Sequence, residues 1–199
     1  MNTTGRRPGP DEAPEKAPDE APVELLAAAL GPRARGCFTT RGAGAPPVSA
    51  RAPYAGLNLA LHVGDDAARV GRARRRLEEA LGLGRRTGAG AREPGLAWMN
   101  QVHSAVVARA RPQDGPDDAP AADALVLSSR DSRDRPPAPR PAGVAVMVAD
   151  CVPLLLAADD GTIVAAVHAG RRGMLDGVVT AAVEAMAGLG ADPAGLWAA

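Results

Sequence analysis

Apolar residues recur along this chain with two periods, and each period predicts a class of element. Over residues 65–83 they fall at helical spacing, and Asp65 or Asp66 precedes them as a candidate N-cap. The positions are Val70, Ala73, Leu77 and Leu81. A second helix is predicted over residues 175–189 by the apolar stripe of Leu175, Val178, Val179, Ala182, Val183 and Met186. Both helices are expected to lay one apolar face on a core.

Short apolar runs bounded by turn residues predict strands. One short strand that runs into a glycine turn is expected within residues 36–44. Further strands are expected over residues 96–110, 123–129, 143–151, 152–159 and 162–170. Asp159, Asp160 and Gly161 separate the last two runs and predict a hairpin turn. Residues 23–30 fit either a short helix or a strand. Because helices and strands are mixed without a regular βαβ order, the pattern predicts an α+β fold, with mixed β-sheets flanked by helices.

Three segments interrupt this pattern. Residues 1–22 are rich in Pro, Ala and Glu and are expected to be a disordered tail. Residues 84–95 and 128–143 are rich in Arg, Gly and Pro without an apolar period, which predicts surface insertions. The remaining chain, 23–199, is expected to be one domain.

Composition narrows the classes of protein. The 23 basic and 23 acidic residues balance, which argues against nucleic acid or an anionic membrane surface as a partner. No run approaches the roughly 18 apolar residues of a membrane span, and the N-terminus has no apolar core of a signal peptide. Two cysteines fit a reducing compartment, so a cytoplasmic location is expected.

One cysteine and two histidines stand at the ends of predicted strands: His103, Cys151 and His168. A His/Cys/His set suits Zn²⁺ with one coordination position left open, as expected of a catalytic zinc. Two other interpretations fit the same residues. Cys151 and a histidine can form a nucleophile pair, or all three can be ordinary packed side chains. Cys37, beside Phe38 in a predicted strand, is expected to be structural.

Several motifs carry a resemblance to a known family. They are FTTRGAG (38–44), PYAGLNLALHVG (53–64), HVGDD (62–66), NQVHSAVV (100–107), ADALVL (122–127), VADCVPLLLAADDG (148–161) and VHAGRRG (167–173). In this order and spacing, over about residues 36–199, the chain resembles the laccase-domain family. That family is also called multicopper polyphenol oxidases, and many members are described as purine nucleoside phosphorylases.

The resemblance implies a metal site and an activity. It implies that His103, Cys151 and His168 bind the metal and are catalytic, with Zn²⁺ as the ion and copper possible by the family's label. It implies phosphorolysis of adenosine, inosine, guanosine and methylthioadenosine, with adenosine deaminase activity in addition. Purine nucleosides and phosphate are then the partners. The implied fold is a single laccase-domain-like, cysteine-hydrolase-like α/β sandwich.

Substrate contacts are predicted around this site. Gly170-Arg171-Arg172-Gly173 directly precedes a predicted helix, so Arg172 is the favoured phosphate contact. Arg41 is the second phosphate contact by resemblance. Gln101 and Asn58 can hydrogen-bond substrate, and His62 is either a further site residue or, as we favour, a packed strand histidine.

Two departures from the family bear on function. Arg171 stands where the family usually has Trp, and the sequence ends at GLWAA where family members continue with an Ile-Gly-Pro segment. We therefore expect a C-terminally truncated domain that binds zinc but turns over nucleosides poorly. The alternatives are a metal-independent Cys–His hydrolase and a non-catalytic truncated member. Copper oxidation of phenols ranks low, because a multicopper centre needs more histidines than the three present.

Overall fold

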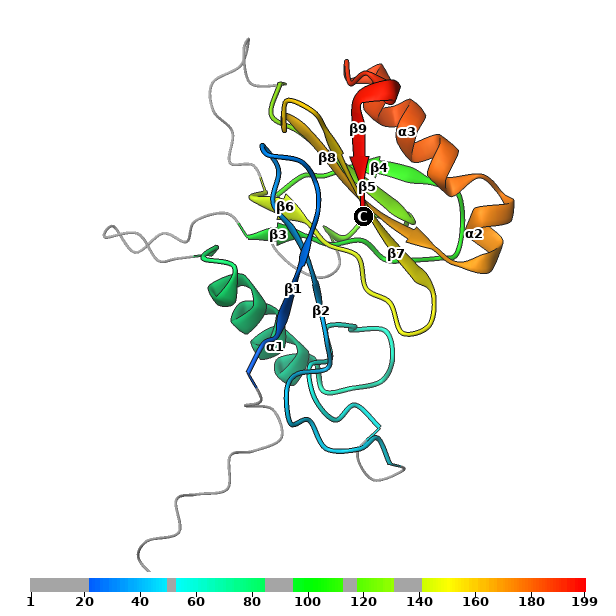
Figure 1. The fold of residues 1–199 in the computed structure, drawn as a ribbon. Helices are drawn as coiled ribbons and strands as arrows, with labels where there is room; N and C mark the ends of the chain where they lie inside the picture. The colour runs from blue at the N-terminus through cyan, green and yellow to red at the C-terminus, as the bar shows by residue number, and fades with distance from the viewer. Residues whose placement is uncertain (1–21, 50–52, 85–94, 113–117, 131–140) are drawn as a thin grey trace, which may run out of the picture.

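The strands of the C-terminal half form a five-stranded sheet (Figure 1). A computed structural model describes residues 22–49, 53–84, 95–112, 118–130 and 141–199. In spatial order the strands are β4 (Val107–Arg109), β5 (Ala124–Ser128), β8 (Ile163–Ala169), β7 (Val152–Ala158) and β9 (Leu196–Ala198). β4 pairs with β5 in parallel, and the other pairs are antiparallel. The sheet is therefore mixed, as the α+β prediction requires.

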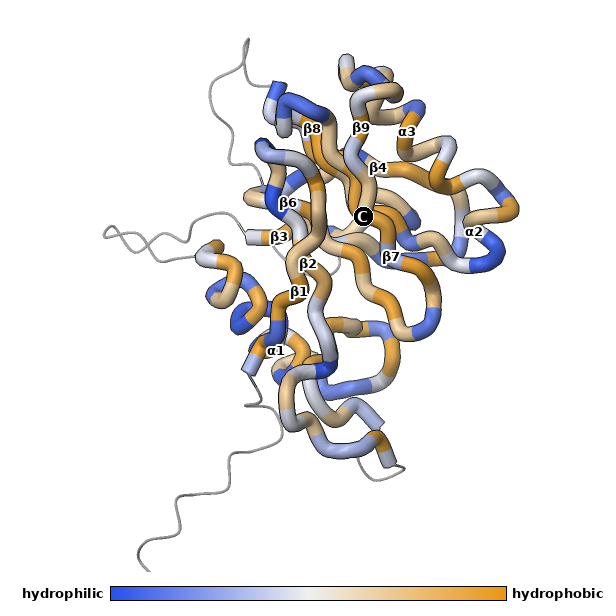
Figure 2. Tube along the Cα trace, in the orientation of Figure 1, coloured by the Kyte–Doolittle hydropathy of each residue, from blue (hydrophilic) through white to orange (hydrophobic). Residues whose placement is uncertain are grey.

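Helix α3 (Val178–Gly188) packs against β8 and β5 of this sheet. Val178, Ala182 and Met186 recur every four residues on its inner face, and all three are fully buried. The tube in Figure 2 shows apolar colour along the packed strands and α3. Among the described residues, no helix combines the length and hydropathy needed to cross a bilayer.

The predicted second helix begins later than its apolar stripe suggests. A short helix α2 (Arg171–Leu175) comes first, and Gly177, with φ of +89°, separates it from α3. Leu175 belongs to α2 and is 80% exposed, so its assignment to the buried stripe was wrong. The left-handed turn at Gly177 rotates the chain between the two helices, which places Leu175 off the inner face of α3.

The hairpin predicted between the last two apolar runs is confirmed. β7 and β8 pair antiparallel around a turn in which Gly161 has φ of +69° and donates its N–H to Ala158 O at 2.8 Å. Asp160 accepts hydrogen bonds from the backbone N–H and the hydroxyl of Thr162, and its other oxygen lies 2.5 Å from Arg130. These polar contacts tie the turn to the end of β5 and fix where the two strands begin to pair.

A second layer is built mostly by residues that precede β4, together with β6. It contains the antiparallel pair β1 (Leu25–Ala28) and β2 (Gly36–Thr39), helix α1 (Ala67–Ala80), and the parallel pair β3 (Leu96–Ala97) and β6 (Gly143–Val144). Residues 23–30 thus hold a strand. Asp66 caps α1 as predicted, accepting from the N–H of Arg69 at 2.6 Å. The guanidinium carbon of Arg74 lies 4.0 Å from the Trp98 ring centroid, which connects α1 to the end of β3.

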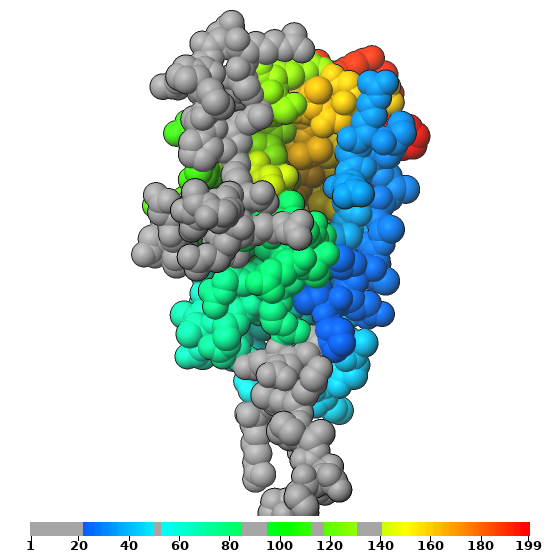
Figure 3. Space-filling view, turned by 90° about the vertical axis from the view of Figure 1, so that its left-hand side faces the viewer, coloured from blue at the N-terminus to red at the C-terminus, as the bar shows by residue number. Residues whose placement is uncertain are grey.

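A cavity of about 1310 Å³ lies between this second layer and the main sheet. Its lining includes Cys37 and Phe38 of β2, Leu77 of α1, Val144 of β6 and Leu155 of β7. Figure 3 shows the hollow between the blue β1–β2 pair and the green and yellow segments.

Two predicted strands are much shorter than expected. Residues 96–110 form only β3 and β4, and residues 143–151 contribute only β6. Side chains instead form hydrogen bonds with backbone groups between β3 and β4 and after β6. The carboxylate of Asp123 accepts from the N–H groups of residues 102–104, and the Gln101 amide bonds both the N–H and the carbonyl of Met147. The predicted tail (1–22) and most of the two predicted insertions fall outside the described residues.

Candidate metal centre

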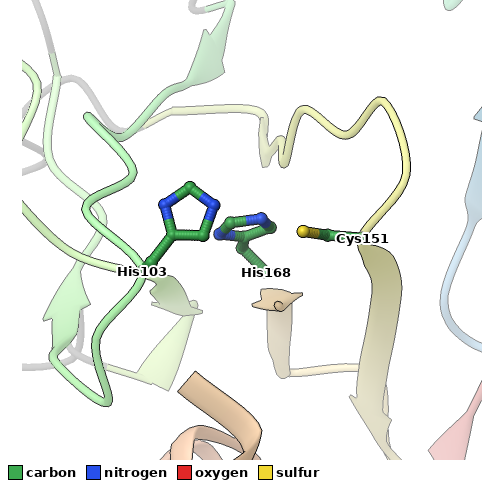
Figure 4. A group of neighbouring side chains, drawn as sticks. All are labelled: His103, Cys151 and His168. Carbon is green, nitrogen blue, oxygen red and sulfur yellow. The ribbon is translucent and has the colours of Figure 1, made fainter. Parts of the chain in front are cut away.

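Three potential ligands from separate parts of the sequence meet at one end of the main sheet. His103 lies in the loop between β3 and β4, Cys151 directly precedes β7, and His168 is the penultimate residue of β8. The ligand atoms of these three side chains all lie within 4.8 Å of one another. Figure 4 shows them pointing toward one another, with His168 between His103 and Cys151. The predicted convergence of His103, Cys151 and His168 is therefore present in the fold.

The β7–β8 hairpin brings two of the ligands together. Pro153 pairs with His168 and Val152 pairs with Ala169, so Cys151 emerges beside the end of β8. The rings of His103 and His168 meet edge to face, with centroids 4.7 Å apart and an interplanar angle of 80°. His168 is buried, Cys151 is half-buried and His103 is exposed. The group is therefore buried on the side of His168 and open to solvent on the side of His103. A metal site with an exchangeable ligand requires such an open side.

Glycines leave room for this group. A Cβ placed on Gly170 lies 3.2 Å from Cys151 Sγ, 3.2 Å from His103 Cδ2 and 3.4 Å from His168 Cε1. A Cβ on Gly173 lies 2.7 Å from Ser104 O, so this glycine allows α2 to approach the His103 loop. Gly170 of HAG therefore leaves space for the three ligands, and Gly173 of RRG leaves space for the loop that carries His103.

His103 adopts a backbone conformation that is uncommon outside glycine. Its φ of +59° is the sole positive φ of a non-glycine residue in the described chain. Such a left-handed residue costs on the order of 1–3 kcal/mol and persists only where surrounding contacts hold it. Three consecutive backbone N–H groups, those of Val102, His103 and Ser104, donate to the carboxylate of Asp123 and hold this loop.

Asp123 is a site residue that the sequence analysis did not single out. It is fully buried directly before β5, and its Oδ1 lies 2.8 Å from Nδ1 of His168. The Ser104 hydroxyl also donates to it at 2.7 Å. Burial tends to raise the pKa of this carboxyl, but the hydrogen bonds from His168, Ser104 and His103 together bring the pKa below its usual value. Asp123 is thus an ionised acceptor in contact with both histidine segments.

The thiol of Cys151 has a raised pKa. Desolvation is the main cause, and the negative charges of Asp150 and Asp123 add to it. Without a cation the sulfur is therefore held as the neutral thiol, which is a poor nucleophile. A bound cation reverses this balance, because thiolate is the form that ligates metal.

The other predicted site residues are placed as follows. Gln101 uses its amide on Met147, with Nε2 donating to the carbonyl at 2.7 Å and Oε1 accepting from the N–H at 2.9 Å. Asn58 donates to Asp65 at 2.8 Å, and its Oδ1 accepts from the N–H of Ala60. Both amides are thus engaged within the protein.

The two predicted phosphate contacts differ in their surroundings. Arg41 donates to the carbonyls of Pro46 and Ala55, each at 2.8 Å, and it lines the large cavity together with Asn58. Arg172 lies in the first turn of α2 with a side chain 79% exposed, 3.6 Å from Asp176. Neither arginine belongs to the group of three ligands. Arg172 is placed on the exposed segment that directly follows Gly170 of the site.

Two further sequence expectations concern single residues. His62 lies in an exposed turn between the second layer's strands and α1, so its interpretation as a packed strand histidine was wrong. Cys37 lies in β2 opposite Ala27 and lines the cavity, where burial raises the pKa of its thiol. It is not part of the three-ligand group, which is what the structural role predicted for it implies.

The donor set, its mixed burial and the glycine beside it form a group that could hold one metal ion at the end of the mixed sheet of an α+β fold. Residues 35–199 match the family described as multi-copper polyphenol oxidoreductase laccase. The chain belongs to this family.

Relatives and solved structures agree with that assignment. A purine nucleoside phosphorylase of Streptomyces griseus is 45% identical over 158 residues, covering 78% of this chain and 55% of that protein. One of Corynebacterium glutamicum is 38% identical over 161 residues, covering 80% and 56%. A DUF152 protein of Neisseria meningitidis superposes with a TM-score of 0.64 at 29% identity, covering 88% of this chain and 60% of that one. The chain thus spans about half the length of the curated relatives it matches.

Proposed function

We propose that this chain carries the metal centre of a zinc-dependent purine nucleoside phosphorylase, with adenosine deaminase activity in addition. The observation that supports it best is the convergence of His103, Cys151 and His168 beside Gly170. Two imidazoles and a thiolate fit Zn²⁺ and leave one coordination position for a substrate or solvent oxygen. Relatives named purine nucleoside phosphorylases supply the reaction class.

The donor set also bears on which metal is bound. Within the described residues, the three side chains are the one group of His, Cys, Asp or Glu residues suited to a metal ion. One such group holds one ion, whereas a multicopper oxidase requires several coppers. When bound, zinc supplies a Lewis acid with an open coordination position.

Phosphorolysis sets three tasks for the protein's own residues. Phosphate must be held against the anomeric carbon of the ribose, the N-glycosidic bond must break, and the departing purine must receive a proton. Arg172 is the proposed phosphate contact, because its guanidinium is exposed on the segment after Gly170. Gln101 is proposed to act indirectly, since its amide holds the loop before Cys151 through Met147.

Arg41 is proposed as the second phosphate contact and Asn58 as a hydrogen-bonding partner of the substrate; both side chains line the large cavity. Arg41 donates to the carbonyl of Ala55 and Asn58 donates to Asp65, and these hydrogen bonds hold the two side chains in place. Residues 23–199 form the proposed domain unit. The substrates proposed are adenosine, inosine, guanosine and methylthioadenosine, each with phosphate.

The test is phosphate-dependent purine release by the purified protein at known zinc content. Parent protein is compared with His103→Ala and Cys151→Ala, and with the matched controls His62→Ala and Cys37→Ala, which change the same residue types outside the site. We expect both site variants to lose bound zinc and purine release together while both controls keep them. Zinc binding unchanged in the site variants contradicts the metal centre, and purine release unchanged in the site variants contradicts a role of that centre in phosphorolysis.

A Cys–His hydrolase is the second candidate, because Cys151 lies beside two imidazoles. The raised pKa of the Cys151 thiol counts against it. A hydrolase is inactivated by thiol alkylation and is insensitive to a chelator, whereas the zinc enzyme loses activity with both treatments.

A further inference from the structure

We propose that Asp123 is a positioning residue for the metal centre, which holds His168 in its metal-binding tautomer and holds the His103 loop in its bent form. The inference rests on the proposed metal site and adds a residue that does not itself ligate. Asp123 links segments that are 20 and 45 residues away from it in the sequence, and both carry a ligand.

A single oxygen connects the two histidine segments. Oδ1 of Asp123 accepts from the backbone N–H of His103 at 2.9 Å and lies 2.8 Å from Nδ1 of His168. The other oxygen accepts from Ser104, through its N–H at 2.6 Å and its hydroxyl at 2.7 Å, and from the N–H of Val102 at 3.3 Å. The main chain adds one more link, because the N–H of His168 donates to the carbonyl of Asp123 at 2.7 Å.

These contacts determine the tautomer of His168. Each backbone N–H group around the Asp123 carboxylate can only donate, so the carboxylate must be its acceptor. It therefore accepts from His168 as well, which places the imidazole proton on Nδ1. The lone pair is then left on Nε2, the nitrogen free to bind a metal ion. Since Asp123 is fully buried and His168 is 3% exposed, water does not compete for this hydrogen bond.

The same carboxylate holds His103 where its ring faces the other ligands. The positive φ of His103 is flanked by the two N–H groups that donate to Oδ2, so the loop closes around the carboxylate. The negative charge of the Asp123 carboxylate also favours a cation at the neighbouring ligands. Both effects depend on the carboxylate and not on the size of the side chain.

The distinguishing variant is Asp123→Asn, which keeps the size and removes the charge and one acceptor. With an amide, either a backbone N–H loses its acceptor or Nδ1 of His168 faces an N–H donor. When Nδ1 of His168 faces an N–H donor, the imidazole proton is favoured on Nε2. A protonated Nε2 cannot bind a metal ion. We expect zinc affinity, measured by competition with a chromophoric chelator, to fall about 10–100-fold. The matched control is Asp65→Asn, which changes a hydrogen-bonded carboxylate outside the group of ligands and is expected to leave the affinity unchanged.

A second measurement covers the case in which Asp123→Asn does not fold. Side-chain ¹⁵N NMR of the metal-free parent reports the tautomer of each histidine, with the exposed His62 as an internal reference. We expect His168 to carry its proton on Nδ1 in the parent. A proton on Nε2 in the parent, or a folded Asp123→Asn variant whose zinc affinity lies within twofold of the parent, overturns the proposal. Both readouts are independent of purine release, so a failed phosphorylase assay leaves this test intact.

Discussion

Gly170→Ala adds one methyl group at the metal centre and changes little else. The backbone of Gly170 has φ of −71° and ψ of 160°, a conformation that alanine adopts without strain. The added Cβ is 3.2 Å from both Cys151 Sγ and His103 Cδ2, so these side chains must move by a few tenths of an ångström. Metal–ligand distances tolerate only about ±0.2 Å. The variant should therefore bind metal less well while keeping its fold.

The expected loss is about tenfold to a hundredfold in zinc affinity, or about 1.4–2.7 kcal/mol, comparable to other disturbances around metal ligands. Chelator competition measures the affinity, and thermal unfolding of the metal-free protein measures the fold. Alanine is also a poorer N-cap than glycine for α2, so a small decrease in stability is expected. The matched control is Gly188→Ala at the end of α3, where an added Cβ meets nothing within 4 Å. If Gly170→Ala binds zinc as tightly as the parent, the three side chains do not form the site in the arrangement described.

Two further predictions concern stability. Met186→Ala should reduce the free energy of unfolding, measured by urea denaturation, by about 2–5 kcal/mol, because Met186 is fully buried between α3 and the sheet. The control Met174→Ala, at an exposed position, should change this free energy little. A loss below about 1 kcal/mol for Met186→Ala would contradict the packing. Asp160→Asn should lower the melting temperature at pH 7, because hydrogen bonds from Thr162 and Arg130 hold the Asp160 pKa well below its usual value. Such a carboxylate stabilises the fold above the unfolded pKa of about 4, and this contribution disappears as pH falls through the folded pKa. The difference between parent and variant should therefore shrink progressively as pH falls below about 4, and a difference that stays constant or grows on acidification would refute this origin.

Local patterns in the sequence were sufficient for half of the candidate site. Asp159-Asp160-Gly161 between two apolar runs predicts the hairpin, and the hairpin alone places Cys151 beside His168. The same holds for α1, whose cap and apolar face are encoded within one segment. These elements are predictable because short-range turn and periodicity signals determine them.

The His103 side of the site could not be predicted in the same way. Residues 96–110 have the apolar composition of a strand, yet a carboxylate from residue 123 binds the N–H groups that a strand would use for pairing. The available signal was the position of Asp123, a charged residue between apolar neighbours in ADALVL. A buried charge in such a run requires several donors, but the sequence does not say which segment supplies them. Gln101 shortens the predicted strand at 143–151 for the same reason.

The β7–β8 hairpin limits where residues can be inserted without moving Cys151 away from His168. Residues on the two strands pair in fixed register, and successive side chains alternate between the faces of the sheet. One residue inserted into β8 before His168 would turn its ring to the opposite face, whereas residues inserted within the turn at Asp159–Gly161 leave the register intact. An added pair of residues in β7 must be matched by an added pair in β8 to bring Cys151 and His168 to the same level. The length of this hairpin is therefore adjustable only in symmetric steps of two.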